Sequence, residues 1–345
     1  MTLAASAFVF GAMVSLATSF VLVVRLERVG ERLGLSEALL GIVAAFAANA
    51  PEITSSISAL AQGNKSIGAG VVVGSNVFNL AALLGLGALV AGFIKLHRRV
   101  ILLGGAVALW ISLCCVAAVS GLAPVAACLV AAAAALGPYL AILGVHRSTL
   151  LRLPLPSRWR LWLAASVDEE EMELTDAIRP QRGRPVDAAV AATALIVVVV
   201  ASIAMELGAT SLGHHFHIAD AVIGGLVLAA VTSLPNAVAA VHLAAQDRGA
   251  AALSTALNSN NLNVVVGLLI PGVILGIAGT SGPGVLTALW YLSLTAIALV
   301  LAYVASGLGR WAGGAIVAGY VGFVISLITA TRGHALVIGL AAKFT

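Results

Sequence analysis

The stretch that decides the fold is "AAFAANAPEITSS" at residues 44–56, which places a proline and a glutamate inside a long apolar run. A related stretch, "LAAVTSLPNAVAA" at residues 228–240, has the same shape but carries Asn236 where the glutamate would lie. Proline has no N–H and leaves a carbonyl of the preceding helical turn unpaired. Each stretch therefore predicts an apolar helix that is interrupted at its proline.

The composition places these helices in a membrane. The chain is 61% hydrophobic and only 9% charged, its mean hydropathy is +1.09, and a soluble domain carries about 25% charged residues. The net charge of +4 does not indicate nucleic-acid binding, because the basic residues lie at helix ends. The cysteines, Cys114, Cys115 and Cys128, lie in apolar runs and are expected to be packing residues. No cofactor is expected.

Polar, Gly and Pro clusters divide the chain into ten apolar segments, each near the roughly 20 residues that a spanning helix needs. The expected spans are 2–24, 37–61, 66–94, 100–119, 122–145, 187–209, 218–245, 249–278, 284–305 and 311–331. The fold class is therefore an all-α polytopic membrane protein. Residues 1–146 and 187–345 form two five-helix blocks, separated by a polar cytoplasmic linker at 147–186.

The basic residues predict the orientation. With the N-terminus outside, every Lys and Arg except Lys65, Arg332 and Lys343 lies in a loop on the inner side. Cytoplasmic loops carry the excess of Lys and Arg. Both termini are therefore expected outside, in a bacterial-type inner (plasma) membrane. The sequence leaves the oligomeric state open.

The two blocks repeat each other at a constant offset of 184 residues, which carries Pro51 onto Pro235, Ser75 onto Ser259 and Asn79 onto Asn263. Because each block has an odd number of spans, the second copy enters the membrane from the opposite side. Inverted repeats with interrupted helices place their substrate site near mid-membrane, between the copies.

Each copy supplies oxygen ligands to such a site. The prolines are expected to free the carbonyls of Ala47 and Ala48 in the first copy and of Val231 and Thr232 in the second. The following helices contribute "GSNVFN" (74–79) and "NSNNLN" (258–263), in which Ser and Asn four residues apart share one face. Carbonyl oxygens suit hard cations.

Glu52 is the one carboxylate expected near mid-membrane. A charge there costs about 2.5–3.5 kcal/mol on insertion scales and is rarely idle. A protonated glutamate that only ties helices together is the structural alternative. Glu206, nearer the outer surface, is expected to reach water.

The motifs "TSLPN" and "GSNVFN" resemble the repeats of the calcium/cation antiporter superfamily, which includes the sodium/calcium exchangers. The resemblance covers both halves and implies alternating access, in which two helices slide over an ion-holding core. It also implies which residues bind the ion. They are Ala48 (backbone carbonyl), Asn49, Glu52, Ser75, Asn79, Thr232 (backbone carbonyl), Ser233, Asn236, Ser259 and Asn263.

The chain departs from the family pattern at Asn236, where calcium exchangers usually keep a second acid, and at Ala48-Asn49, where a Thr-Ser pair is usual. With Glu52 alone, bound Ca²⁺ would leave about one net positive charge, whereas a monovalent ion would be neutral. We expect a cation antiporter that exchanges Ca²⁺ or another cation for Na⁺ or H⁺. The alternatives are a monovalent cation/H⁺ exchanger, a membrane-embedded enzyme and a non-transporting ligand-binding homologue.

Overall fold

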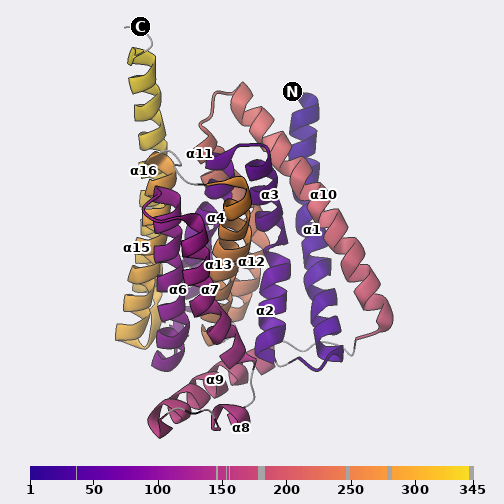
Figure 1. Ribbon diagram of the computed structural model, residues 1–345, viewed down its shortest axis with the longest axis vertical. Coiled ribbons are helices and arrows are strands. Elements are labelled where there is room, and N and C mark those ends of the chain that lie inside the picture. Colours follow the sequence, from indigo (N-terminus) through magenta and orange to yellow (C-terminus); the bar gives the residue numbers. More distant parts are fainter. Residues whose placement is uncertain are drawn as a thin grey trace.

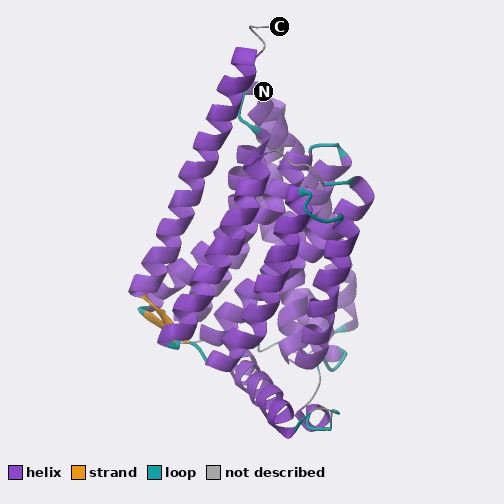
Figure 2. Ribbon diagram, turned by 60° about the vertical axis from the view of Figure 1, so that its left-hand side comes forward, coloured by secondary structure: helices purple, strands orange, loops and turns teal. Residues whose placement is uncertain are grey.

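The computed structural model describes residues 1–35, 37–144, 147–152, 154, 156–177, 183–245, 249–277 and 282–341, and almost all of them are helical (Figures 1 and 2). The start of the first helix and the end of the last lie at the same end of the bundle (Figure 1). This agrees with an even number of membrane crossings.

The first half is a bundle of long helices and one interrupted helix. Its elements, with η for π-helical segments, are α1 (Thr2–Arg32), α2 (Glu37–Ala48), α3 (Ala50–Ala61), α4 (Lys65–Asn79), η1 (Leu80–Leu86), α5 (Gly87–Ala91), β1 (Phe93–Lys95), α6 (Arg98–Ser120) and α7 (Val125–Leu143).

The second half follows two linker helices, α8 (Arg147–Leu150) and α9 (Ser157–Ala177). Its elements are α10 (Pro185–His215), α11 (Asp220–Val222), η2 (Ile223–Leu228), α12 (Ala229–Ala245), α13 (Gly249–Leu262), η3 (Asn263–Leu269), α14 (Ile270–Leu275), α15 (Gly282–Ala305), β2 (Gly307–Gly309) and α16 (Arg310–Ala341). The antiparallel pair β1–β2, orange in Figure 2, ties the end of the third span to the start of α16.

Within the described residues, nine helices are long and apolar enough to cross a membrane, and they match nine of the ten expected spans. The second expected span, residues 37–61, forms α2 and α3, which are 12 residues each. Neither reaches the roughly 20 residues of a full span. The expected count of ten is therefore met only if these two half-helices together cross the membrane.

The first helices of the two halves run antiparallel, as an inverted repeat requires. Arg25 near the end of α1 pairs with Asp187 at the start of α10, at 2.5 Å. Ser15 and Ser202 share a hydrogen bond of 2.8 Å near the middle of both helices. Gly208, late in α10, faces the backbone of Phe8, early in α1. Position rises along one helix as it falls along the other, so the second half is inverted relative to the first.

Glycine allows the closest approach of the two halves. A Cβ added to Gly74 of α4 would lie 2.3 Å from the carbonyl oxygen of Gly225 in η2, and one added to Gly70 would lie 2.9 Å from the Gly225 nitrogen. A side chain at either position would collide with backbone. Gly74 and Gly225 therefore let α4 pack directly against η2.

The expected linker contains an ordered helix. α9 lies at the end of the bundle away from the termini (Figure 1) and contacts α2, α6 and α13. Leu163, Ala164 and Val167 are buried, whereas Trp159 and Leu161 are exposed. The segment is thus more than a solvated connection, although the side chains of its acidic run from residue 169 lie outside the described part of the chain.

Candidate functional site

The first proline interrupts its helix as expected. α2 ends at Ala48, Asn49 stands between the two helices, and Pro51 lies in the first turn of α3. Because proline cannot donate, the Ala47 carbonyl is left without its helical partner. The Ser19 hydroxyl of α1 donates to this carbonyl at 3.4 Å. The freed carbonyl predicted at Ala47 therefore faces a polar neighbour from another helix.

The second proline behaves differently, so the expectation of two identical breaks is wrong. Pro235 lies inside α12, which runs without interruption from Ala229 to Ala245. One turn before it, the Thr232 hydroxyl donates back to the Leu228 carbonyl at 2.9 Å. The carbonyl that Pro235 frees is that of Val231 rather than Leu228, so this bond lies near the proline without replacing the hydrogen bond that the proline removes.

Glu52 is fully buried and is contacted from the other half of the protein. Its Oε1 accepts hydrogen bonds from Ser233 Oγ at 3.1 Å and from Asn236 Nδ2 at 3.4 Å, both on α12. Its Oε2 has no hydrogen-bond partner among the described residues. The α3–α12 contact therefore leaves one carboxylate oxygen available to a ligand.

Asn49, Asn236 and Ser259 form a hydrogen-bonded triangle beside Glu52. The Asn49 Oδ1 accepts from Asn236 Nδ2 at 2.9 Å and from Ser259 Oγ at 2.6 Å. The Asn49 Nδ2 donates in turn to the Ser259 carbonyl at 2.9 Å. The residue at the first helix break is thus held by both repeated motifs of the second half.

Four asparagines form a two-fold ring between the end of α4 and the junction of α13 with η3. Asn76 Nδ2 donates to the Asn260 carbonyl, and Asn260 Nδ2 donates to the Asn76 carbonyl, both at 3.1 Å. Asn79 Nδ2 donates to Asn260 Oδ1 at 3.0 Å, and Asn263 Nδ2 donates to Asn76 Oδ1 at 3.2 Å. Adding or subtracting 184 turns each bond of a pair into the other. The ring is therefore a direct expression of the sequence repeat.

Sequence reasoning missed Asn76 and Asn260, although the signal was present. Both lie in the quoted motifs, and they occupy equivalent positions at the same offset of 184. Both are buried. They were passed over because the Ser-x-x-x-Asn spacing selected the neighbouring face of the helix.

The other predicted residues lie in or beside these groups. Ser75 Oγ donates to the Val72 carbonyl and accepts weakly from Asn263 Nδ2 at 3.4 Å. Ala48 is half-buried at the end of α2. Every predicted residue except Ala48 is buried, so these residues have almost no contact with water in this conformation.

The free acceptors of the site are oxygens. Besides Glu52 Oε2, the side-chain oxygens of Asn79 and Asn263 are buried without a hydrogen-bond partner among the described residues. An unsatisfied buried polar atom costs about 1–3 kcal/mol, which a bound cation would offset. Carboxylate and amide oxygens are the ligands that hard cations prefer. The arrangement can hold a dehydrated cation.

Glu206 is a second buried carboxylate, and the expectation that it reaches water is wrong. It has no exposed surface. Ser58 of α3 and Gln62, the residue directly after α3, donate to its Oε2, each at 2.8 Å. Thr210 donates to its Oε1 at 3.0 Å. The Glu206 carboxylate therefore accepts hydrogen bonds from neutral side chains, and not from water as its position in the sequence suggested.

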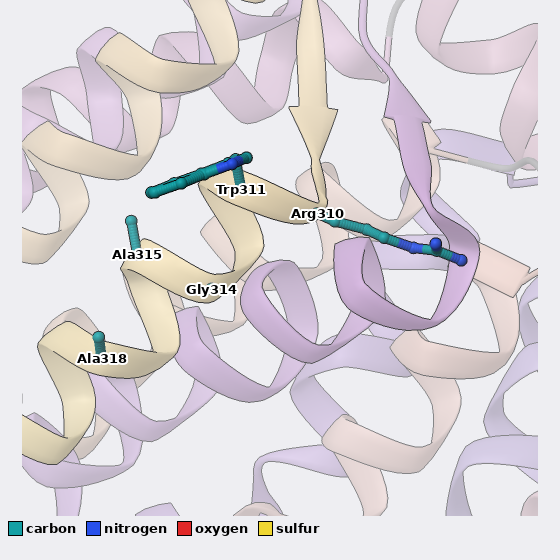
Figure 3. A pocket seen from close by; sticks show the side chains of 5 residues that line it. All are labelled: Arg310, Trp311, Gly314, Ala315 and Ala318. Carbon is teal, nitrogen blue, oxygen red and sulfur yellow. The ribbon is translucent and has the colours of Figure 1, made fainter.

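A surface hollow on α16 is separate from these residues. It is lined by Arg310, Trp311, Gly314, Ala315 and Ala318 (Figure 3). Trp311 and the two alanines line up along the outside of the helix, whereas the Arg310 side chain extends away from them (Figure 3). None of the predicted site residues contributes to it, and its lining offers no oxygen-rich set of side chains.

The sequence matches a known protein family. The family model described as sodium/calcium exchanger protein matches residues 3–146 and 187–329. No curated protein matches the sequence.

Several solved structures share the fold. The sodium-calcium exchanger NCX_Mj, soaked without Na⁺ and Ca²⁺, is similar at a TM-score of 0.54 and 20% identity, covering 94% of this chain and 99% of that one. The H⁺/Ca²⁺ exchanger CAX is similar at a TM-score of 0.68 and 12% identity, covering 99% of this chain and 87% of that one. Because the family model spans most of both halves, the chain is an integral membrane protein that belongs to the sodium/calcium exchanger family of cation antiporters.

Proposed function

We propose that the protein is a secondary active antiporter that exchanges Ca²⁺ or another cation for Na⁺ or H⁺ by alternating access. The observation that carries the proposal is the buried Glu52 carboxylate, which has one free oxygen and is surrounded by hydroxyls and amides from both halves. The similarity to a sodium-calcium and an H⁺/Ca²⁺ exchanger supports this set of ions.

The charge of the site favours a second candidate within the same class, a monovalent cation/H⁺ exchanger. Glu52 is the one ionisable side chain among the ten site residues. A monovalent cation bound to it forms a neutral pair, whereas Ca²⁺ leaves a net positive charge that is costly to bury. Asn236, 3.4 Å from Glu52, occupies the place of a second acid without supplying a charge.

Alternating access is supported by the burial of the site and by the construction of the bundle. In this conformation the proposed ligands other than Ala48 are buried, as the closed intermediate of such a cycle requires. α1 and α10 pack on each other along their length through Gly11, Gly208 and the Ser15–Ser202 bond. We assign this pair as the unit that slides against the site helices and exposes Glu52 to one side and then the other.

The distribution of basic residues supports an orientation with both termini outside, in a bacterial-type inner membrane. The end that bears Lys65 and Gln62 is then the outer end, and α9 lies on the cytoplasmic side. The proposed ligands remain the ten residues named from the sequence, joined by Asn76 and Asn260 as the residues that hold Asn79 and Asn263 in place.

A flux screen in proteoliposomes tests the proposal. Ca²⁺, Na⁺, K⁺, Mn²⁺ and Mg²⁺ are offered against Na⁺ or proton gradients, for the wild type and for Glu52→Gln. We expect gradient-driven uptake of at least one cation by the wild type and no uptake by Glu52→Gln. Asp220→Asn serves as the matched control, because it removes an exposed carboxylate that pairs with His214 outside the site.

The outcome separates the rival classes. A membrane-embedded enzyme or a non-transporting homologue would show no flux of any ion under any gradient. Flux that persists in Glu52→Gln would remove Glu52 from the transport mechanism and with it this proposal.

A further inference from the structure

Four polar residues on α3 and directly after it form a stripe, and three of them contact α10. Starting at Glu52, the stripe continues through Ser55 and Ser58 to Gln62, a spacing of three or four residues that keeps them on one side of the helix. Glu52 is fully buried and Gln62 is exposed, so the stripe leads from the proposed ion site to water.

α10 contributes polar groups that accept hydrogen bonds from this stripe. Ser55 Oγ donates to the Ser202 carbonyl at 3.4 Å, and Ser58 and Gln62 both donate to Glu206. We call the residues Ser55, Ser58, Gln62, Ser202 and Glu206 the α3–α10 seam. The seam is a polar contact between the two helices, and it contains a carboxylate between water and Glu52.

The repeat does not require this seam. The residues at the offset of 184 from Ser55, Ser58 and Gln62 are Ala239, His242 and Gln246. The serine stripe is thus absent from the equivalent sequence of α12. A feature that one half has and the other lacks is not explained by the shared architecture.

The charge of Glu206 also lacks a structural explanation. None of the ion pairs in the described part of the chain involves this carboxylate, whose partners there are two hydroxyls and an amide. Ionisable groups buried in a membrane without a charged partner are costly and mark ion pathways. A carboxylate between Gln62 and Glu52 therefore lies where a cation would pass.

We propose that Glu206 is a second cation-binding carboxylate, a transit site at which a cation from the Gln62 side of the membrane is bound before it reaches Glu52. The inference rests on the proposed antiport function and adds a residue to it. Ser58, Thr210 and Gln62 each carry a side-chain oxygen, so rotation of these side chains turns donors to Glu206 into ligands of a cation beside it. When a cation binds the Glu206 carboxylate, the hydrogen bonds from Ser58 and Gln62 to that carboxylate are lost, and the contact between α3 and α10 is weakened.

Transport measured separately from each side tests this site. In oriented proteoliposomes offered Ca²⁺, and in a parallel series Na⁺, Glu206→Gln should raise the half-saturating concentration of the transported cation on the Gln62 side about tenfold, as loss of one charged contact implies. The half-saturating concentration on the opposite side and the maximal rate should stay within about twofold. Ser58→Ala, which keeps the carboxylate and removes one neutral oxygen ligand, should raise the half-saturating concentration on the same side by a smaller factor than Glu206→Gln.

A second pair of variants keeps the test independent of the folding of Glu206→Gln. Gln62 is exposed, so Gln62→Arg should be tolerated and would place a fixed positive charge beside Glu206. We expect the same one-sided rise, and Gln62→Met, of similar length and no charge, should raise the half-saturating concentration less than Gln62→Arg, because it removes a neutral ligand without adding a repelling charge.

Two results would contradict the transit site. An equal fall in maximal rate from both sides, with unchanged half-saturating concentrations, would make Glu206 only a tie between helices and overturn the proposal. An equal rise on both sides would do the same, since a transit site acts on one side. Neither result affects Glu52, whose own variant tests the proposed function separately.

Discussion

Replacing Asn236 with glutamate tests whether this position sets the charge preference of the site. Asn236 Nδ2 lies 3.4 Å from Glu52 Oε1, so a carboxylate at this position would stand close to the Glu52 carboxylate. At an effective dielectric constant of about 20, two unit charges at this separation repel by about 5 kcal/mol. A cation bound between them relieves that repulsion, and a divalent cation relieves it more than a monovalent one.

The expected gain follows from the same arithmetic. A new carboxylate about 4 Å from the ion attracts each unit of its charge by about 4 kcal/mol at this dielectric constant. A divalent ion therefore gains about 4 kcal/mol more than a monovalent ion before dehydration is subtracted. If dehydration offsets two-thirds of this difference, about 1.4 kcal/mol remains, or about tenfold in relative affinity.

Isothermal titration of Ca²⁺ and Na⁺ into the detergent-solubilised wild type, Asn236→Glu and Asn236→Gln measures this ratio. Asn236→Gln is the matched control, because it has the length of glutamate without the charge. We expect only Asn236→Glu to raise the affinity for Ca²⁺ relative to Na⁺, and its binding to weaken more steeply on acidification because protons compete for the paired carboxylates. The reasoning fails if the wild type already binds Ca²⁺ tightly and Asn236→Glu gains nothing, or if Asn236→Gln gains as much.

Two predictions concern the packing around the site and are read from thermal unfolding in detergent. Asn76→Ala and Asn260→Ala each break one arm of the two-fold ring, and we expect both to lower stability by a similar amount, about 1–3 kcal/mol per unsatisfied partner; widely different losses would contradict the two-fold role. Gly74→Ala should cost about 1–3 kcal/mol or prevent folding, because its Cβ would meet the Gly225 carbonyl oxygen at 2.3 Å. Gly314→Ala, where no atom lies within 4 Å, should be neutral, and equal effects of the two alanines would refute the tight α4–η2 contact.

The spans and the inverted repeat could be predicted from the sequence because both depend on local composition and on counting. Long apolar runs separated by polar clusters mark helices that cannot be solvated, and an odd number of spans per copy inverts the second copy. The offset of 184 also predicted that Glu52 and Asn236 belong to the same site, and in the structure Asn236 Nδ2 lies 3.4 Å from Glu52 Oε1.

The behaviour of each proline depended on its surroundings rather than on its own chemistry. Pro51 lies in the first turn of α3, directly after the interruption that ends α2, whereas Pro235 lies within the continuous helix α12. Both remove the same hydrogen bond. The Ala47 carbonyl that Pro51 frees accepts a hydrogen bond from Ser19 of α1, a contact that only the packing of the two helices creates. No sequence pattern states which helix will lie beside the kink.

The partners of buried polar groups were decided by tertiary structure alone. Glu206 appeared from its position to reach water, yet Ser58 and Gln62 cover it. Asn76 and Asn260 lay in motifs that were already singled out, but their reciprocal bonds became evident only when α4 and α13 were placed together. Hydropathy and spacing report how each residue relates to its own helix. The hydrogen bonds to Glu206 depend on how α3 and α10 are rotated against each other, and the asparagine ring depends in the same way on α4 and α13. Close packing across the whole bundle determines these rotations.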